Sequence, residues 1–169
     1  MYEVGNWIFY GNIGACQVKE IAMRKISGME KEMLYYILQP LNDSCSISTP
    51  ANNGKVFMRP IITKEEAEAL IDSIPEIDAK AYHNSVLRQL SDHYEAALNS
   101  HDCHELIHMA MSIHAKQEQA VSQKRKLGAV DEKFMKRAEE LLFGELSVAL
   151  GIERDQVPQY IAARIEKAG

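Results

Sequence analysis

The sequence has 169 residues, of which 46% are hydrophobic and 25% charged, and its formal net charge is −5. These values are ordinary for a globular protein of one or two small domains, and no apolar run approaches the ~20 residues that span a bilayer. The three cysteines form no Cys-x-x-Cys pair, and residues 1–4 lack the features of a signal peptide. We therefore expect a cytoplasmic protein with reduced thiols and no membrane association.

The first sixty residues have the pattern of short strands. Runs of aromatic, β-branched and other apolar residues alternate with turn-forming glycine, asparagine, serine and proline. Five strands separated by such turns favour a small antiparallel barrel. The predicted strands cover residues 4–10, 15–25, 33–38, 46–49 and 56–59.

From Thr63 onward the periodicity is helical. Thr63 and Glu66 form a capping box, in which each side chain accepts a hydrogen bond from the other residue's backbone amide. Further helices are expected over residues 79–98, from an Asp102 cap, from an Asp131 cap to Gly151, and from Asp155. The sequence thus predicts an α+β protein, with a β domain at residues 1–62 and a compact domain of four to five helices at residues 63–169.

Basic residues cluster in one part of the acidic second half. Residues 116–137 contain seven basic and three acidic side chains, whereas residues 64–169 together contain thirteen basic and nineteen acidic ones. Such a local excess of positive charge suits contact with phosphate. By themselves, the residues equally fit a solvated loop, which is the preferred interpretation.

One catalytic motif is present. Residues 104–108 read H-E-L-I-H and match H-E-x-x-H, in which two histidines on one helical face bind zinc and the glutamate is the general base. The longer form of the motif needs a turn-forming glycine where this chain has Met111, before His114. Since His104 and His108 also fall opposite the predicted apolar stripe of their helix, we expect them to be exposed, and a zinc hydrolase is a remote alternative.

Other catalytic signatures are absent from the sequence. It contains no phosphate-binding, dinucleotide-binding or nucleophile-elbow motif. Cys103 lies beside His104, but neighbouring helix positions point in different directions, which favours a structural cysteine over an activated thiol. We therefore predict no catalytic residue, no metal ligand and no cofactor.

Short motifs in consistent order along the chain resemble one known family. Residues 4–14 are similar to a V-G-D-x-V-V-Y-P-x-x-G opening, and residues 26–38 to an I-x-G and Y-x-V-L hairpin. Thr49-Pro50 matches a V-P pair that precedes a segment ending in an arginine. Residues 98–102 resemble L-x-S-G-D, and residues 143–152 resemble L-x-x-E-L-A-x-A-L-G-I. Together these motifs resemble the CarD family, including the related domain of the transcription-repair coupling factor.

The resemblance implies a Tudor-like β domain that pairs with the β subunit of RNA polymerase by strand addition. Family members often carry an arginine where this chain has Ser48. The implied polymerase-binding residues are Arg24, Lys25, Ile26, Ile47 and Ser48.

The resemblance also implies that the helical domain contacts the upstream edge of the promoter −10 region. Basic side chains there hold phosphates, and a tryptophan wedges into the minor groove. This chain has Leu87 at the tryptophan position, and Asp92 and Glu95 leave the same helix poorly basic. The implied DNA-binding residues are Leu87 as the wedge and Arg88, Lys124, Arg125, Lys126, Lys133 and Arg137 on the backbone.

We therefore expect a non-enzymatic transcription regulator. It would bind the RNA polymerase β subunit and modulate promoter open-complex formation through weak, mainly backbone contacts with promoter DNA. The alternative is a polymerase-binding adaptor without DNA contact, which the absence of the wedge tryptophan and the acidic helical half favour.

Overall fold

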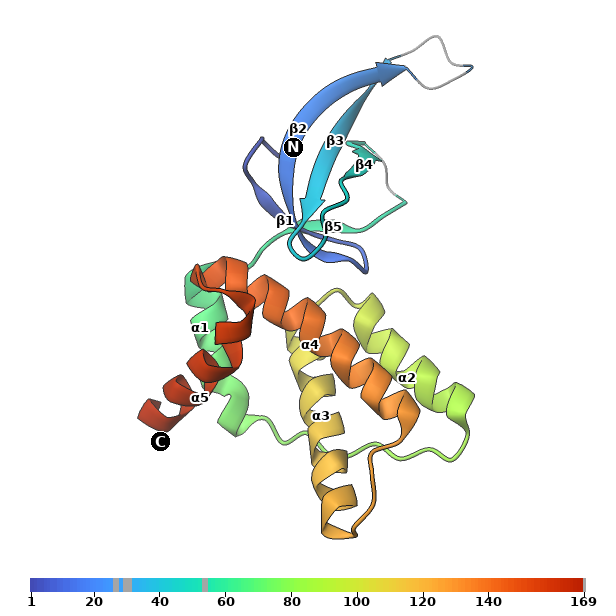
Figure 1. Cartoon of the computed structure of the whole chain (residues 1–169), viewed down its shortest axis with the longest axis vertical. Helices are drawn as coiled ribbons and strands as arrows, with labels where there is room; N and C mark the ends of the chain where they lie inside the picture. The colour runs from blue at the N-terminus through green and yellow to red at the C-terminus, as the bar shows by residue number, and fades with distance from the viewer. Residues whose placement is uncertain (26–27, 29–31, 53–54, 169) are drawn as a thin grey trace. The chain divides into compact units, whose positions relative to one another are not determined.

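The computed structural model describes residues 1–25, 28, 32–52 and 55–168, and the chain divides into two compact units, Met1–Ile62 and Thr63–Gly169. The first unit contains the strands and the second the helices, so the α+β architecture is confirmed (Figure 1). Within the described residues, no helix is long and apolar enough to cross a membrane.

The described residues of the first unit form a five-stranded antiparallel sheet with the strand order β4-β3-β2-β1-β5. The prediction of five strands separated by turns is confirmed. Figure 1 shows that β2 and β3 are the long strands of this sheet. The strands are β1 Trp7–Tyr10, β2 Gly14–Lys25, β3 Glu32–Pro40, β4 Ile47–Pro50 and β5 Met58–Pro60.

The sheet curls around a small apolar core. Tyr10 of β1 donates a hydrogen bond from its hydroxyl to Thr49 Oγ1 of β4 at 3.2 Å, and both residues are buried. Since β2 and β3 separate these strands in the sheet order, the bond requires the sheet to fold toward itself. A shift of the β2–β3 register between Val18 and Glu20 marks a bulge, which bends a strand. The core consists of Ile8, Tyr10, Cys16, Val18, Tyr36 and Leu38.

The described residues of the second unit form five α-helices and two short 3₁₀ turns. The predicted capping box is present, because Thr63 Oγ1 accepts from the Glu66 amide at 3.1 Å and the Glu66 carboxylate accepts from the Thr63 amide. The helices are α1 Lys64–Ser73, α2 Leu87–Asn99, α3 Cys103–Ser122, α4 Ala129–Leu150 and α5 Val157–Ala168, and the 3₁₀ turns are η1 Ile74–Glu76 and η2 Arg154–Gln156.

The core of this unit joins α2, α3 and α4. Leu90 and Tyr94 of α2 pack with Met109 and Ile113 of α3, and Phe134 of α4 contacts Tyr94 with a ring-centroid distance of 5.3 Å. The buried apolar side chains of α4 are Phe134, Ala138, Leu141, Leu142, Leu146 and Leu150.

The predicted helix over residues 79–98 begins too early. Residues 77–84 carry no regular structure, and α2 starts only at Leu87. Contacts with distant residues explain the difference: Ser112 donates to the Lys80 carbonyl at 2.7 Å, and the Tyr82 ring stacks on His93 at 3.7 Å. Tertiary packing holds this segment extended although its residues tolerate a helix.

The predicted Asp131 cap is also wrong. The N-cap of α4 is Gly128, and Asp131 lies inside the first turn with 3% of its surface exposed. Its carboxylate accepts from the Tyr94 hydroxyl at 2.6 Å and from Lys116 Nζ at 3.0 Å. Asp131 therefore joins three helices instead of capping one.

Candidate functional site

β4 forms one outer edge of the sheet. It pairs with β3 along Ile47–Pro50, and no other strand of the described residues pairs with it. Unpaired amides and carbonyls on such an edge are a template for an additional strand. Ile47 is half-buried against the core, whereas Ser48 is exposed.

A basic side chain lies next to this edge. Arg24, near the end of β2, donates from Nη1 to Ser48 Oγ at 3.3 Å across the intervening strand β3. Lys25 follows it as the last residue of β2 and is exposed. Ile26 lies outside the described residues. The structure thus brings Arg24 and Ser48 together, and the surface offers positive charge beside hydrogen-bonding backbone.

An exposed apolar pair begins α2. Val86, the N-cap residue, is 48% exposed, and Leu87 is 63% exposed. Arg88 follows and is also exposed. Leucine is one of the apolar side chains that wedge between base steps in minor-groove binders.

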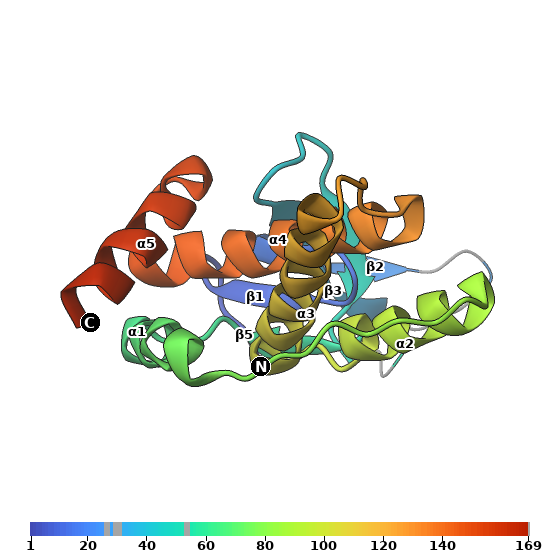
Figure 2. The same ribbon diagram turned by 90° about the horizontal axis from the view of Figure 1, so that it is seen from below.

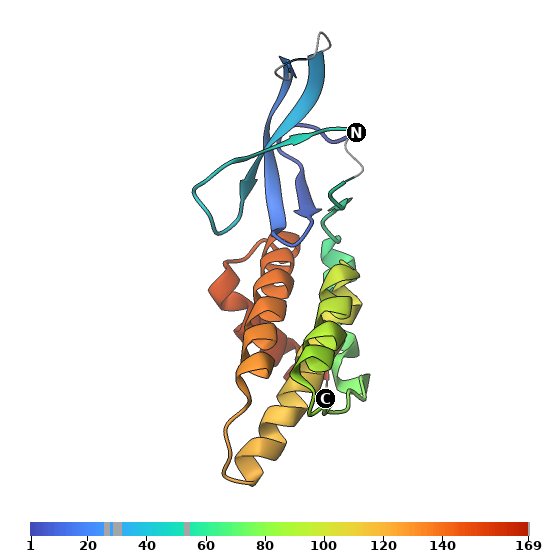
Figure 3. The same ribbon diagram turned by 90° about the vertical axis from the view of Figure 1, so that its right-hand side faces the viewer.

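The α3–α4 loop presents three consecutive cations. Lys124, Arg125 and Lys126 are exposed and follow the last turn of α3. The Arg125 amide donates to the Ala120 carbonyl at 2.7 Å, and Lys124 has a φ of 58°. This pattern is a Schellman turn, which fixes the loop backbone, and positive charge is favourable at a helix C-terminus. Figure 3 shows the loop at the end of α3.

Two further cations lie on α4. Lys133 Nζ is 5.5 Å from the centre of the Phe134 ring, and Arg137 pairs with Glu140 at 3.7 Å. Lys116, which the sequence places in the same basic cluster, is instead held by the buried Asp131. In Figures 1 and 2, α2 and α4 both begin on the right-hand side of the helical unit. The predicted DNA-binding residues therefore come from three segments and form no single stripe along one helix.

The two histidines of the H-E-x-x-H motif are exposed on α3, as predicted. His114 Nε2 lies 3.3 Å from Glu118 Oε1, one turn further along the same helix. Neighbouring side chains of this helix were expected to point in different directions. At the start of α3 they lie closer together than expected, because donor atoms of Asp102, Cys103 and His104 lie within 4.8 Å of one another.

The helical unit also has an open hollow of about 580 Å³, which no sequence pattern indicated. Its lining includes Lys80 and Tyr82 from the extended segment, His93 from α2, and Glu105 and His108 from α3. The extended course of residues 77–84 creates the hollow. Since that segment has a helical sequence pattern, no local signal could have predicted it.

The fold and the basic sheet edge define an α+β protein whose first unit is a curled sheet suited to binding an extended segment of a partner. Residues 2–62 match the family model of the CarD-like/TRCF RID domain, the RNA-polymerase-interacting domain. The first unit is thus similar to this domain family, which is consistent with a CarD-family protein. The match supports a transcription-related function that involves binding to RNA polymerase.

Proposed function

We propose that this protein regulates transcription initiation by docking its first unit on the β subunit of RNA polymerase and contacting promoter DNA with its helical unit. It acts by binding and carries out no reaction of its own. The observation that carries the proposal is the Arg24–Ser48 hydrogen bond, because it places a cation directly beside the β4 edge. The match of residues 2–62 to a polymerase-interacting domain supports the choice of partner.

Docking is proposed to add a strand of the polymerase to β4. Backbone hydrogen bonds along the edge then supply affinity, and Arg24 and Lys25 select an acidic or polar segment. A charge-assisted hydrogen bond contributes about 1.5–3 kcal/mol. The Arg24→Ala substitution is therefore expected to weaken binding to the isolated β-subunit lobe about tenfold or more.

The matched control is Lys19→Ala, which removes an exposed cation from the same strand. Five strand positions, about 17 Å, separate Lys19 from Arg24. The affinity of both variants is measured by surface plasmon resonance on the immobilised β-subunit lobe. The control should bind the lobe as tightly as the wild type does. Equal affinity of the wild type and Arg24→Ala would discard the assignment of Arg24 to the docking surface.

Modulation of the open complex is proposed to depend on Leu87 and the exposed cations. Leu87 is exposed enough to enter a minor groove, and the Schellman turn presents Lys124, Arg125 and Lys126 to a phosphate backbone. Apolar wedges of this kind unstack base steps and favour opened or bent DNA.

A polymerase-binding adaptor without DNA contact is the second candidate. It is favoured by the acidic balance of residues 64–169 and by Leu87, which cannot stack or donate a hydrogen bond as an indole does. DNA binding measured with and without polymerase separates the two functions. The adaptor leaves the affinity of polymerase for promoter DNA unchanged.

A further inference from the structure

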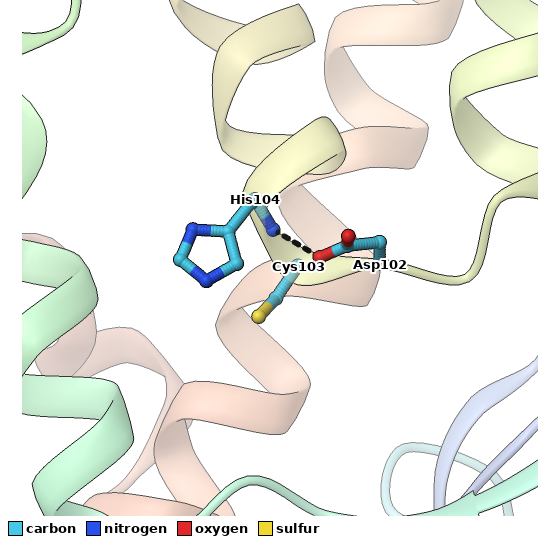
Figure 4. A group of neighbouring side chains, drawn as sticks. All are labelled: Asp102, Cys103 and His104. Carbon is cyan, nitrogen blue, oxygen red and sulfur yellow. Dashed lines mark hydrogen bonds between the residues drawn. The ribbon is translucent and has the colours of Figure 1, made fainter.

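The first turn of α3 groups three side chains of metal-ligating type. Donor atoms of Asp102, Cys103 and His104 all lie within 4.8 Å of one another, and Figure 4 shows the carboxylate, thiol and imidazole gathered around this turn. Cys103 is 6% exposed, whereas the other two residues are exposed. The thiol therefore lies on the buried side of the cluster, and solvent reaches the carboxylate and the imidazole.

We propose that this Asp-Cys-His cluster binds a divalent transition-metal ion of the zinc type. Thiolate, imidazole and carboxylate are the three kinds of side chain that hold zinc in proteins. This donor set selects zinc-like ions over magnesium or calcium, which prefer oxygen ligands only. Three protein ligands leave the fourth tetrahedral position to water.

Local structure already holds the carboxylate in place. Asp102 is the N-cap of α3, and its Oδ1 accepts from the His104 amide at 2.9 Å. A carboxylate has a second oxygen, so the capping bond and metal ligation are compatible. The cap thus acts as an outer support that orients a ligand, as hydrogen bonds to metal ligands commonly do.

The charges of the site also balance. A helix N-terminus stabilises anions, which favours a carboxylate and a thiolate at its first positions. Their two negative charges neutralise the double charge of the ion, and the imidazole adds a neutral donor. Binding releases the thiol proton to solvent, so affinity should rise with pH.

This site differs from the one that the H-E-x-x-H motif describes. Both use His104, but the motif pairs it with His108, which lies outside the three-residue cluster. The two sites therefore predict opposite effects of substitutions at Cys103 and His108.

The test uses the full-length protein after removal of metals with a chelator. Titration with Zn²⁺ against a competing indicator dye should give one bound ion per chain, and Co²⁺ should give a thiolate-to-cobalt charge-transfer band. Cys103→Ala should abolish the band. Asp102→Asn keeps a good N-cap residue and should weaken Zn²⁺ binding about tenfold or more. The control His108→Ala should leave the band and the affinity unchanged.

Three results would overturn the proposal. Absence of stoichiometric binding rejects a metal site, and a cobalt band that survives Cys103→Ala assigns the thiolate to another cysteine. Loss of binding in His108→Ala with retention in Cys103→Ala assigns the ion to the H-E-x-x-H pair. Circular dichroism of each variant checks the fold, and Asp102→Asn decides the outcome if Cys103→Ala is unfolded.

Discussion

His101 and Lys124 are the residues other than glycine that adopt a positive φ in the described part of the chain, at 55° and 58°. His101 directly precedes the Asp102 cap, and it stands where the motif L-x-S-G-D, which residues 98–102 resemble, has a glycine. The structure gives the physical reason for that glycine, because the left-handed conformation costs a residue with a Cβ about 1–2 kcal/mol. In this chain His101 and Lys124 adopt the left-handed conformation in spite of this energetic cost.

Lys124 allows the cost to be measured. Lys124→Gly is expected to raise the free energy of unfolding by about 1 kcal/mol relative to Lys124→Ala, since both variants remove the charge but only glycine relieves the backbone. Urea denaturation of the two variants measures the difference. Equal stability would mean that the loop backbone is unstrained at this position.

A buried ionic cluster joins α2, α3 and α4. Lys116 Nζ lies 3.0 Å from both oxygens of Asp131, and the Tyr94 hydroxyl donates to Oδ1 of the same carboxylate at 2.6 Å. Burial, followed by the negative charge and hydrogen bond of Asp131, raises the pKa of Tyr94 well above its ordinary value of 10.0. Tyr94 therefore stays protonated and donates throughout the physiological range.

Removal of one partner from this cluster should destabilise the helical unit strongly. Lys116→Met leaves a buried carboxylate with one neutral donor, and the expected loss is about 3–5 kcal/mol. The double variant Lys116→Met/Asp131→Asn should recover part of it, because no unpaired charge remains. Thermal and urea unfolding of the single and double variants check the prediction, and a single-variant loss under about 1 kcal/mol would contradict it.

At the scale of elements, an ion-pair network joins α1 to α5 through Asp72 and Arg164, which lie 92 positions apart in the chain. Arg164 donates from Nε to Asp72 Oδ1 at 2.7 Å and from Nη2 to Oδ2 at 2.9 Å, and its Nη1 lies 3.4 Å from Glu68. The bidentate geometry gives this contact specificity. The hydrogen bond from Arg164 is the main cause that lowers the pKa of Asp72 below its ordinary value of 3.8.

This lowered pKa makes the contact pH-dependent. A carboxyl group whose folded pKa lies below its unfolded value stabilises the fold above the unfolded value, and the contribution is lost as the pH falls through the folded one. The melting temperature of Asp72→Asn should therefore be below that of the wild type at neutral pH and should converge with it below pH 3.8. Because the pair is at the surface, a salt concentration of about 1 M should shrink the difference.

Arg164→Gln provides the second arm of this experiment. It removes the cause of the pKa shift and should abolish the same pH-dependent part of stability. The double variant should then lose no more than the larger single loss, as expected for residues in direct contact. Fully additive losses would show that the two side chains act separately.

Local sequence predicted the elements whose signals are short-range. The Thr63 capping box starts α1, Gly151 ends α4 with a φ of 70°, and turn residues separate the five strands. The sequence pattern could not predict where α2 begins, because Ser112 and His93 hold the preceding segment through contacts that form only in the folded chain.

The site was predictable to a similar extent. The resemblance pointed to Arg24 and Ser48, and the structure places them within hydrogen-bond distance, although a strand separates them. The sequence could not predict that Lys116 pairs with the buried Asp131 and so is unavailable to the basic cluster. The local sequence around Asp131 indicated a helix cap instead of an ion pair. Pairings between helices depend on packing geometry, which no local pattern encodes.

At the scale of the whole molecule, charge is distributed unevenly between the two units. The first 63 residues contain six basic and five acidic side chains, whereas the remainder contains thirteen and nineteen. Contact between an acidic unit and DNA is therefore expected only through local clusters of cations, in a complex where polymerase holds the protein near the promoter. The salt dependence of that complex reports such contacts.

Charge reversal of Lys124, Arg125 and Lys126 tests this expectation. Removal of one phosphate contact lowers the magnitude of the slope of log K against log salt concentration by about 0.9, so removal of all three would lower it by nearly three units. The quantity to measure is the difference in slope between promoter complexes formed with and without this protein. Reversal of Lys64, Lys80 and Lys167 changes the net charge of the helical unit by the same amount outside the predicted contacts. If both triple variants shift the slope equally, a general charge effect explains the result. If neither does, the protein works as an adaptor that touches polymerase alone.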